Sequence, residues 1–170
     1  IADYFGLEAA AQYGLMLQLC MVPMGMAESA VGKVYQGHLA TMVRSGISGN
    51  FDRNKIKFAL LGLAVLFLIT MYYIVPFVIQ KGLDGNWELA IDLIYIMSPA
   101  FAVMIFVSPL TVAFFVFKMG KIEMFGQAIW LMLILFSMGV GIYLNNIIVG
   151  ISGFSLITIV RLLILYFYAE

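Results

Sequence analysis

The longest stretch without a charged side chain sets the strongest constraint on this sequence. No Asp, Glu, Lys, Arg or His occurs in residues 124–160. One crossing of a bilayer takes about 20 apolar residues, so this stretch is too long for one crossing and suits two. Asn145 and Asn146 lie near its middle, with glycines on both sides. We therefore predict a hairpin of two membrane helices joined by a tight polar turn.

The composition indicates that lipid is the solvent for the rest of the chain as well. Hydrophobic residues make up 64% of the sequence and charged residues 11%, with a mean hydropathy of +1.07. Soluble domains carry about 25% charged residues, so there is too little polar surface here to cover a water-facing globule. The formal net charge is zero, which gives no indication of a nucleic-acid partner. Cys20 is the single cysteine, so no disulfide can form within the chain.

Five membrane spans can be placed along the sequence. Helices satisfy their own backbone hydrogen bonds in lipid, and the alternating, roughly 10-residue segments of a membrane barrel do not occur. The expected fold class is therefore all-α: one polytopic transmembrane helix bundle over residues 1–170. The spans are predicted at residues 9–27, 58–79, 89–117, 125–144 and 147–168. Residues 28–57 are predicted as a cytoplasmic helix extension followed by a loop, because apolar residues recur there at threes and fours as far as Met42.

The basic residues of the connectors predict the orientation. The connector between the first two spans and the one between the third and fourth hold most of the lysines and arginines, namely Lys33, Arg44, Arg53, Lys55, Lys57, Lys118 and Lys121. The connector between the second and third spans has Lys81 among three acidic residues. Basic connectors stay on the cytoplasmic side. We therefore expect both basic connectors and the C-terminus inside and the start of the chain outside.

The sequence shows no signature of soluble-enzyme chemistry. It has one histidine and one cysteine, and neither a phosphate-binding loop nor a dinucleotide fingerprint. A membrane-embedded transferase would need clustered acidic or histidine residues at one membrane face, and the sequence has no such cluster. We therefore expect a protein that is not an enzyme, with no catalytic residue, metal or cofactor.

Two phrases at helix boundaries carry a family resemblance. Residues 4–15, YFGLEAAAQYGL, are similar to a Phe-Gly-x-Glu-x-x-Gly-x-Tyr phrase that opens a membrane helix, with Ala11 in place of its second glycine. Residues 82–116 are similar to a Gly-x-x-Trp-x-x-Ala segment followed by Ser-Pro-Leu, through Trp87, Ala90 and Ser108-Pro109-Leu110. Together they resemble the Wzx-like polysaccharide flippases of the multidrug/oligosaccharidyl-lipid/polysaccharide exporter superfamily.

This resemblance implies a function, a location and partners. The chain would be most of the C-terminal lobe of a two-lobe, MATE-like transporter in the bacterial inner membrane, with a missing N-terminal lobe as its partner. The cargo would be a polyprenyl-pyrophosphate-linked oligosaccharide, moved from the inner to the outer leaflet by alternating access. The chain starts with Ile1 rather than methionine, so we expect coding sequence for further spans upstream.

Within that reading, one basic and one acidic residue inside or beside the spans are candidates. Arg161 lies inside the last span and could hold the pyrophosphate, because its planar fork suits phosphate. It could instead snorkel to the inner interface. Glu28 ends the first span and is the candidate for proton or cation coupling. It could equally be an interfacial charge that marks the end of the span.

The remaining substrate-binding candidates lie on or after the first span. Gln12 and Gln18 could donate hydrogen bonds to sugars, or could bond to a neighbouring helix. They are six residues apart, so both cannot face one narrow stripe. Lys33 and Arg44 could attract the pyrophosphate at the cytoplasmic mouth, or could contact anionic membrane lipids.

Three alternative functions remain open from the sequence. A drug/cation antiporter of the same fold would favour an acidic cavity, which the few intramembrane polar groups do not clearly show. A peptidoglycan-precursor flippase is a close relative of the preferred function. A small, non-transporting membrane scaffold belongs to another class. A scaffold would satisfy its polar faces within five helices, whereas one lobe of a transporter would leave a polar face without a partner.

Overall fold

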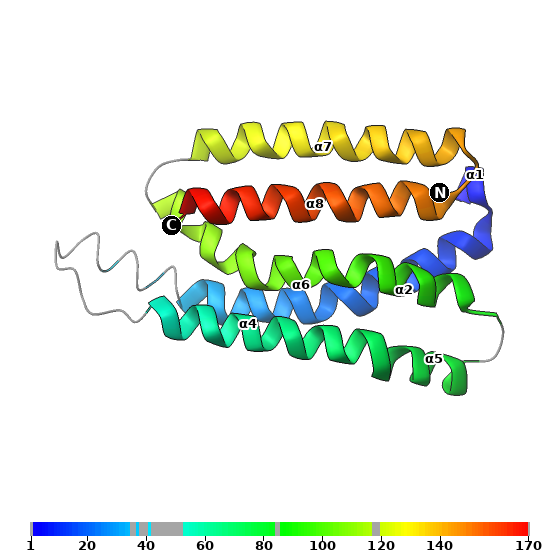
Figure 1. The fold of residues 1–170 in the computed structure, drawn as a ribbon, viewed down its shortest axis with the longest axis horizontal. Coiled ribbons are helices and arrows are strands. Elements are labelled where there is room, and N and C mark those ends of the chain that lie inside the picture. The colour runs from blue at the N-terminus through cyan, green and yellow to red at the C-terminus, as the bar shows by residue number, and fades with distance from the viewer. Residues whose placement is uncertain are drawn as a thin grey trace.

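The computed structural model describes residues 2–34, 37, 41, 53–83, 86–116 and 120–169, and the side chains of all of these except 27, 28, 53, 110–116, 120–123, 168 and 169. Every element in these ranges is a helix (Figure 1). Five helices are long and apolar enough to cross a membrane: Leu7–Gly32, Asn54–Gly82, Glu88–Pro109, Met124–Tyr143 and Ile147–Phe167. The expectation of an all-helical chain with five apolar crossings is thereby confirmed.

The described residues form nine helical elements, of which all except α1 belong to the five crossings. The first crossing follows the short α1 (Ala2–Phe5) and consists of α2 (Leu7–Ala27) and the π-helical segment η1 (Glu28–Gly32). The second consists of α4 (Arg53–Ile69), the π-helical segment η2 (Thr70–Ile74) and α5 (Val75–Gly82). The others are the single helices α6 (Glu88–Val116), α7 (Gly120–Tyr143) and α8 (Ile147–Ala169). The predicted extension after the first span is helical through Val34, and most of residues 35–52 lie outside the described part.

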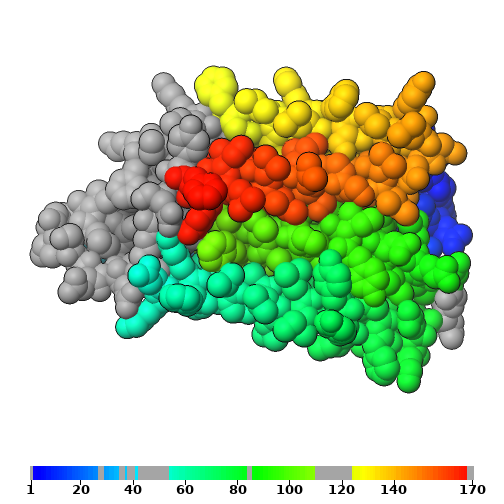
Figure 2. Space-filling model, in the orientation of Figure 1, coloured from blue at the N-terminus to red at the C-terminus, as the bar shows by residue number. Residues whose placement is uncertain are grey.

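Helix α6 is the centre of the bundle. It packs against α8, α2 and α4, and it is the most buried of the five spans. Its core side chains include Leu93, Ile94, Met97, Phe101 and Ile105, each at most 3% exposed. By contrast, α7 packs mainly against α8 and lies along one edge of the molecule (Figure 2). The bundle is therefore asymmetric: one helix is surrounded, while another has a single main neighbour.

A tyrosine compensates for a proline inside the central helix. Pro99 has no N–H, so the carbonyl of Tyr95, four residues earlier, loses its usual helical partner. The Tyr72 hydroxyl donates a hydrogen bond to that carbonyl at 3.0 Å, and the two tyrosine rings stack with centroids 5.2 Å apart. An unpaired carbonyl is costly in lipid, so this bond fastens the second crossing to α6 where α6 needs it.

The turn between α7 and α8 lies in the Asn145-Asn146 region, where the sequence predicts it. Asn145 has a φ of 49°, in the left-handed region that asparagine tolerates at the end of a helix. The N–H groups of Asn146 and Asn145 donate to the carbonyls of Gly141 and Ile142 at 2.9 and 3.0 Å. The side-chain Oδ1 of Asn146 then accepts the N–H of Ile148 at 3.0 Å. One dipeptide thus ends α7 and caps the start of α8.

Glycines bring α7 and α8 into close contact near this turn. A Cβ on Gly141 would lie 2.8 Å from the Cα of Gly150, and one on Gly153 would collide with Ser137. The Ser137 hydroxyl donates to the carbonyl of Gly150 at 2.8 Å. A Cβ on Gly139, by contrast, would have no neighbour within 4 Å. The close packing of α7 on α8 thus involves Ser137 and Gly141 but not Gly139, which the helical rotation places on another face.

Alternate crossings bring charged residues to two opposite ends of the bundle. One end, at the close of the first crossing and the start of the second, carries Lys33, Lys55 and Lys57 (Figure 1). The Lys57 ammonium lies 5.2 Å from the centre of the Tyr166 ring, so α4 and α8 meet at that end. The other end carries mainly acidic residues with Lys81, namely Asp3, Glu8, Glu88 and Asp92. We call these the lysine end and the acidic end.

Candidate functional site

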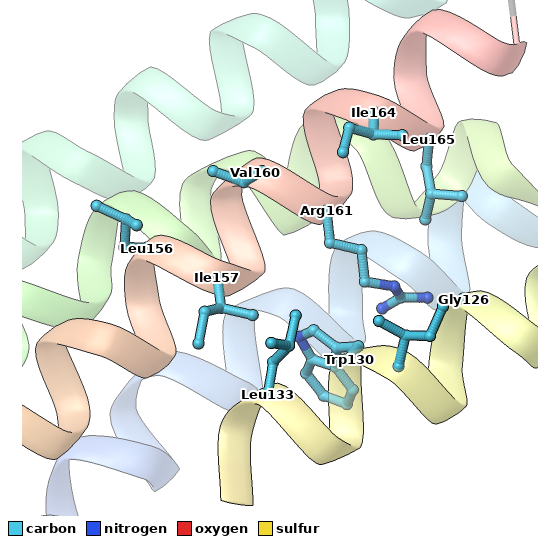
Figure 3. A pocket seen from close by; sticks show the side chains of 10 residues that line it. Gly126, Trp130, Leu133, Leu156, Ile157, Val160, Arg161, Ile164 and Leu165 are labelled. Carbon is cyan, nitrogen blue, oxygen red and sulfur yellow. The ribbon is translucent and has the colours of Figure 1, made fainter. Parts of the chain in front are cut away.

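A cavity of about 460 Å³ forms a groove between α7 and α8 (Figure 3). We call it the α7–α8 groove. Gly126 leaves it open, because nothing lies within 4 Å of the place of a Cβ there. Of the described residues that line it, only Arg161 carries a charge. The others are Gly126, Ile129, Trp130, Leu133, Leu156, Ile157, Val160, Ile164 and Leu165.

Three contacts fix the indole of Trp130 within the groove. Its Nε1–H donates to the Thr158 hydroxyl at 3.2 Å, and its ring lies 6.2 Å from the ring of Phe154. The guanidinium carbon of Arg161 lies 5.2 Å from the indole centroid. A cation at that distance from an aromatic face is attracted by the negative face of the ring. The indole therefore holds the guanidinium in the groove.

Arg161 reaches across the groove from α8 towards α7. Figure 3 shows its side chain running from α8 towards Gly126 of α7, on the side of the C-terminal end of α8. That end lies at the lysine end of the bundle. Arg161 is six residues before the last residue of its span, Phe167, which corresponds to about 9 Å along the helix. Gly126 comes four residues before Trp130 in α7, so the guanidinium lies on the lysine-end side of the indole.

Gln12 joins α2 to the beginning of α6. Its side-chain Oε1 accepts the N–H of Ala90 at 2.9 Å, and its Nε2 donates to the carbonyl of Asn86 at 3.0 Å and to a Glu8 carboxylate oxygen at 3.4 Å. The side chain is only 5% exposed. Ala90 lies in the first turn of α6, where N–H groups have no partner inside the helix. Gln12 therefore caps α6 from a neighbouring helix, as the helix-bonding alternative requires.

Gln18, unlike the buried Gln12, lies on the exposed surface of α2. It is exposed near the middle of the first crossing, and Ala11 and Gly25 are exposed about two turns before and after it along the helix. A Cβ on Gly14 would also meet no atom within 4 Å. We call Ala11, Gly14, Gln18 and Gly25 the α2 face. In the middle of α7, over residues 129–136, the exposed side chains are instead large and apolar, for example Met132 and Phe136 at 72% each.

The hydropathy of the first crossing agrees with the difference between the exposed surfaces of α2 and α7. It has the lowest mean hydropathy of the five candidate spans, yet almost as little of it is buried as of α7. A helix whose exposed surface faces acyl chains is expected to carry large apolar side chains there. Met21, Val22 and Met26 of the same helix are also exposed, at 54%, 62% and 69%, so the α2 face is a narrow stripe of small and polar residues between apolar side chains.

The other predicted residues are placed less fully. Lys33 is exposed at the lysine end of the first crossing. The backbone of Glu28 begins η1, while its side chain and the whole of Arg44 lie outside the described part. Gln12 lies in the contact of α2 with α6, and Arg161 lies between α7 and α8. Of the four substrate-binding candidates that the structure describes, Gln12 and Arg161 thus lie in different helix contacts, and Gln18 and Lys33 are exposed.

A smaller cavity of about 260 Å³ lies at the acidic end. It lies between the end of α5 and the start of α6 and is lined by Ile79, Gln80, Asn86, Trp87, Glu88 and Ile91. Asn86 has a structural role there, because its side-chain oxygen accepts the N–H of Glu88 at 3.3 Å. Among the described residues, no group of three or more His, Cys, Asp or Glu could hold a metal ion.

Sequence reasoning did not find the α7–α8 groove or the role of Trp130. Trp130 and Thr158 are 28 residues apart and meet only because the hairpin is antiparallel. The available signal was the uncharged run itself, which predicts that two helices lie side by side.

Comparisons of the chain with family models, with curated proteins and with solved structures found no match.

Proposed function

We propose that this chain is part of a membrane transporter of the Wzx-like flippase class, and that it moves a polyprenyl-pyrophosphate-linked oligosaccharide from the inner to the outer leaflet of a bacterial inner membrane. The observation that carries the proposal is the α2 face, with the exposed amide of Gln18 in the middle of a span. Polar side chains inside membrane spans face the interior of a bundle or a water-filled cavity. The resemblance of residues 4–15, which open this same helix, supports the family.

The cargo explains why such a face would be needed. The isoprenoid tail is stable in lipid, but the pyrophosphate and sugars are not, and a charge at the bilayer centre is costly. A polar face on one lobe, opposed by a second lobe, gives the head group a hydrated route. Rocking of the two lobes then opens that route to alternate sides. No covalent bond changes in this process.

Two residues of the first crossing take roles in the proposal. Gln18 offers an amide donor and acceptor to the sugars at mid-membrane. Lys33 lies at the lysine end, which the positive-inside rule assigns to the cytoplasm together with the C-terminus. There its charge attracts the pyrophosphate at entry. Gln12 serves the same helix structurally, because its amide is bonded to α6.

A translocation assay tests the proposal. Vesicles would contain the protein and a fluorescent polyprenyl-pyrophosphate disaccharide in both leaflets, and dithionite added outside would destroy the accessible fluorophore. We expect the protected inner pool to be lost with the protein and to persist without it. We expect Gln18→Leu to slow this loss, whereas Gln127→Leu, the same change at an exposed glutamine of α7, leaves the rate unchanged. Persistence of the protected pool with the unaltered protein would show that the protein is not a flippase for this lipid.

A further inference from the structure

The α7–α8 groove combines a long apolar surface with one cation near a membrane interface. Its apolar rims are open, with Ile129 60%, Leu156 65% and Ile164 51% exposed. Its volume of about 460 Å³ falls within the range of about 300–1,000 Å³ that is usual for small-molecule sites. In a membrane, lipid acyl chains would contact these exposed rims, because α7 lies at the edge of the bundle.

The position of the guanidinium adds a head-group preference to this apolar surface. Trp130 and Arg161 lie together at 5.2 Å, with the indole held by Thr158. The guanidinium reaches across the groove towards Gly126, on the lysine-end side of Trp130, while Leu133, Leu156 and Ile157 line the part nearer the bilayer centre (Figure 3). This order, cation towards the interface and apolar walls towards the midplane, matches a lipid of the leaflet at the lysine end. Arginine is also the side chain whose fork best fits phosphate oxygens.

We propose that the α7–α8 groove is a binding site for one anionic phospholipid of that leaflet, with the lipid phosphate on Arg161 and an acyl chain along the groove. Basic sites between membrane helices bind anionic lipid head groups by the same charge complementarity. The site lies on the α7–α8 hairpin and not on the α2 face. It therefore goes beyond the proposed transport function and does not depend on it.

The two tryptophans of the chain make a direct binding measurement possible. Only Trp87 and Trp130 are present, so Trp87→Phe leaves the groove indole as the single tryptophan reporter. The variant would be reconstituted in phosphatidylcholine vesicles that contain increasing fractions of brominated phosphatidylglycerol or, separately, brominated phosphatidylcholine. Bromine quenches the indole on contact. We expect quenching by the anionic lipid to indicate an affinity about fivefold or more above that for phosphatidylcholine, since one basic residue near a membrane gives a preference of about that size.

Charge variants in the same background assign the preference to the groove. Arg161→Gln should reduce the preference to about onefold, and Arg161→Lys should keep part of it, because a charge remains without the planar fork. Lys81→Gln removes a cation at the acidic end and should leave the preference unchanged. Equal quenching by the two lipids, or a preference that survives Arg161→Gln, would overturn the proposal.

Two further measurements keep the test decisive. If Trp87→Phe lowers the helix content, native mass spectrometry of the two-tryptophan protein replaces fluorescence. Retained phosphatidylglycerol that disappears with Arg161→Gln supports the site, and its absence from the unaltered protein refutes it.

Polyprenyl pyrophosphate added at an equal fraction should not relieve the quenching by the anionic phospholipid. If it does, the groove belongs to the cargo and the phospholipid proposal is wrong. Because both measurements are made at equilibrium, a protein that fails to transport can still pass them.

Discussion

Single residues fasten the crossings to the central helix, and Gln12 is the clearest case. Replacing it with alanine would remove the acceptor for the Ala90 N–H and the donor to the Asn86 carbonyl. Leaving buried polar groups without partners costs about 1–3 kcal/mol. We expect Gln12→Ala to lower the unfolding midpoint in detergent by a corresponding amount, measured by circular dichroism. Gln18→Ala, an exposed glutamine of the same helix, should change stability by no more than about 0.5 kcal/mol. Equal losses in the two variants would contradict the capping role.

Tyr72 makes a second prediction at this scale, because its hydroxyl stands in for the N–H that Pro99 lacks. Hydrogen bonds between membrane helices contribute about 0.6 kcal/mol on average and up to about 1.7 kcal/mol. We expect Tyr72→Phe to fall near the upper value, since the stacked ring stays but the Tyr95 carbonyl loses its partner. Tyr73→Phe is the matched control, at a neighbouring ring that is 74% exposed. Restored stability in a Tyr72→Phe, Pro99→Ala double variant would confirm the pairing, and additive effects would argue against it.

The sequence predicts some single-residue roles and not others, for a physical reason. The Asn145-Asn146 turn could be predicted because a polar dipeptide in a long apolar run is a local signal. The capping by Gln12 could not, because it joins residues 78 positions apart and depends on how α2 is rotated against α6. The same holds for Gly139 and Gly141, two residues apart, of which only Gly141 contacts α8. Rotation of a helix about its axis is not determined by its own composition when all its faces are apolar.

The sequence predicts where each helix crosses the membrane, but it does not predict which helices pack against one another. The length and hydropathy of each apolar run locate a crossing, because the bilayer thickness sets the number of residues. The same hydropathy does not show that α6 is central and α7 peripheral, since side chains that face lipid are as apolar as those that face another helix. Pro99 and Pro109 both lie within the single continuous helix α6.

The α7–α8 hairpin gives a prediction about a pair of helices. A methyl group at Gly141 would meet the backbone of Gly150, which cannot move without separating the two helices. Overpacking of this kind costs about 1–3 kcal/mol. We expect Gly141→Ala to destabilise the protein by that amount in thermal unfolding. Gly139→Ala has open space and gains the helix propensity of alanine, so it should be neutral or slightly stabilising. The reverse ranking of the two variants would show that the hairpin packs through another face.

At the scale of the whole molecule, the five crossings separate a lysine end from an acidic end. The positive-inside rule predicts that the lysine end faces the cytoplasm. We therefore expect a green fluorescent protein fused after Lys118 to fluoresce and an alkaline phosphatase fused after Asn145 to be active, since the latter requires export. Phosphatase activity after Asn50 or Lys118 would reverse the orientation. Activity at all three sites would contradict the five crossings themselves.

The central claim is that the α2 face meets water inside the membrane, whereas α7 meets lipid. Substituted cysteines test it in a Cys20→Ala background, because Cys20 is the only native cysteine and is buried. Gln18→Cys on α2 and Met132→Cys on α7 would be treated in sealed vesicles with a membrane-impermeant maleimide; both positions lie well inside their spans. We predict that the cysteine at position 18 is modified and that the one at position 132 is not. Failure to modify position 18 from either side of the membrane, while a cysteine at Lys33 reacts, would contradict the account.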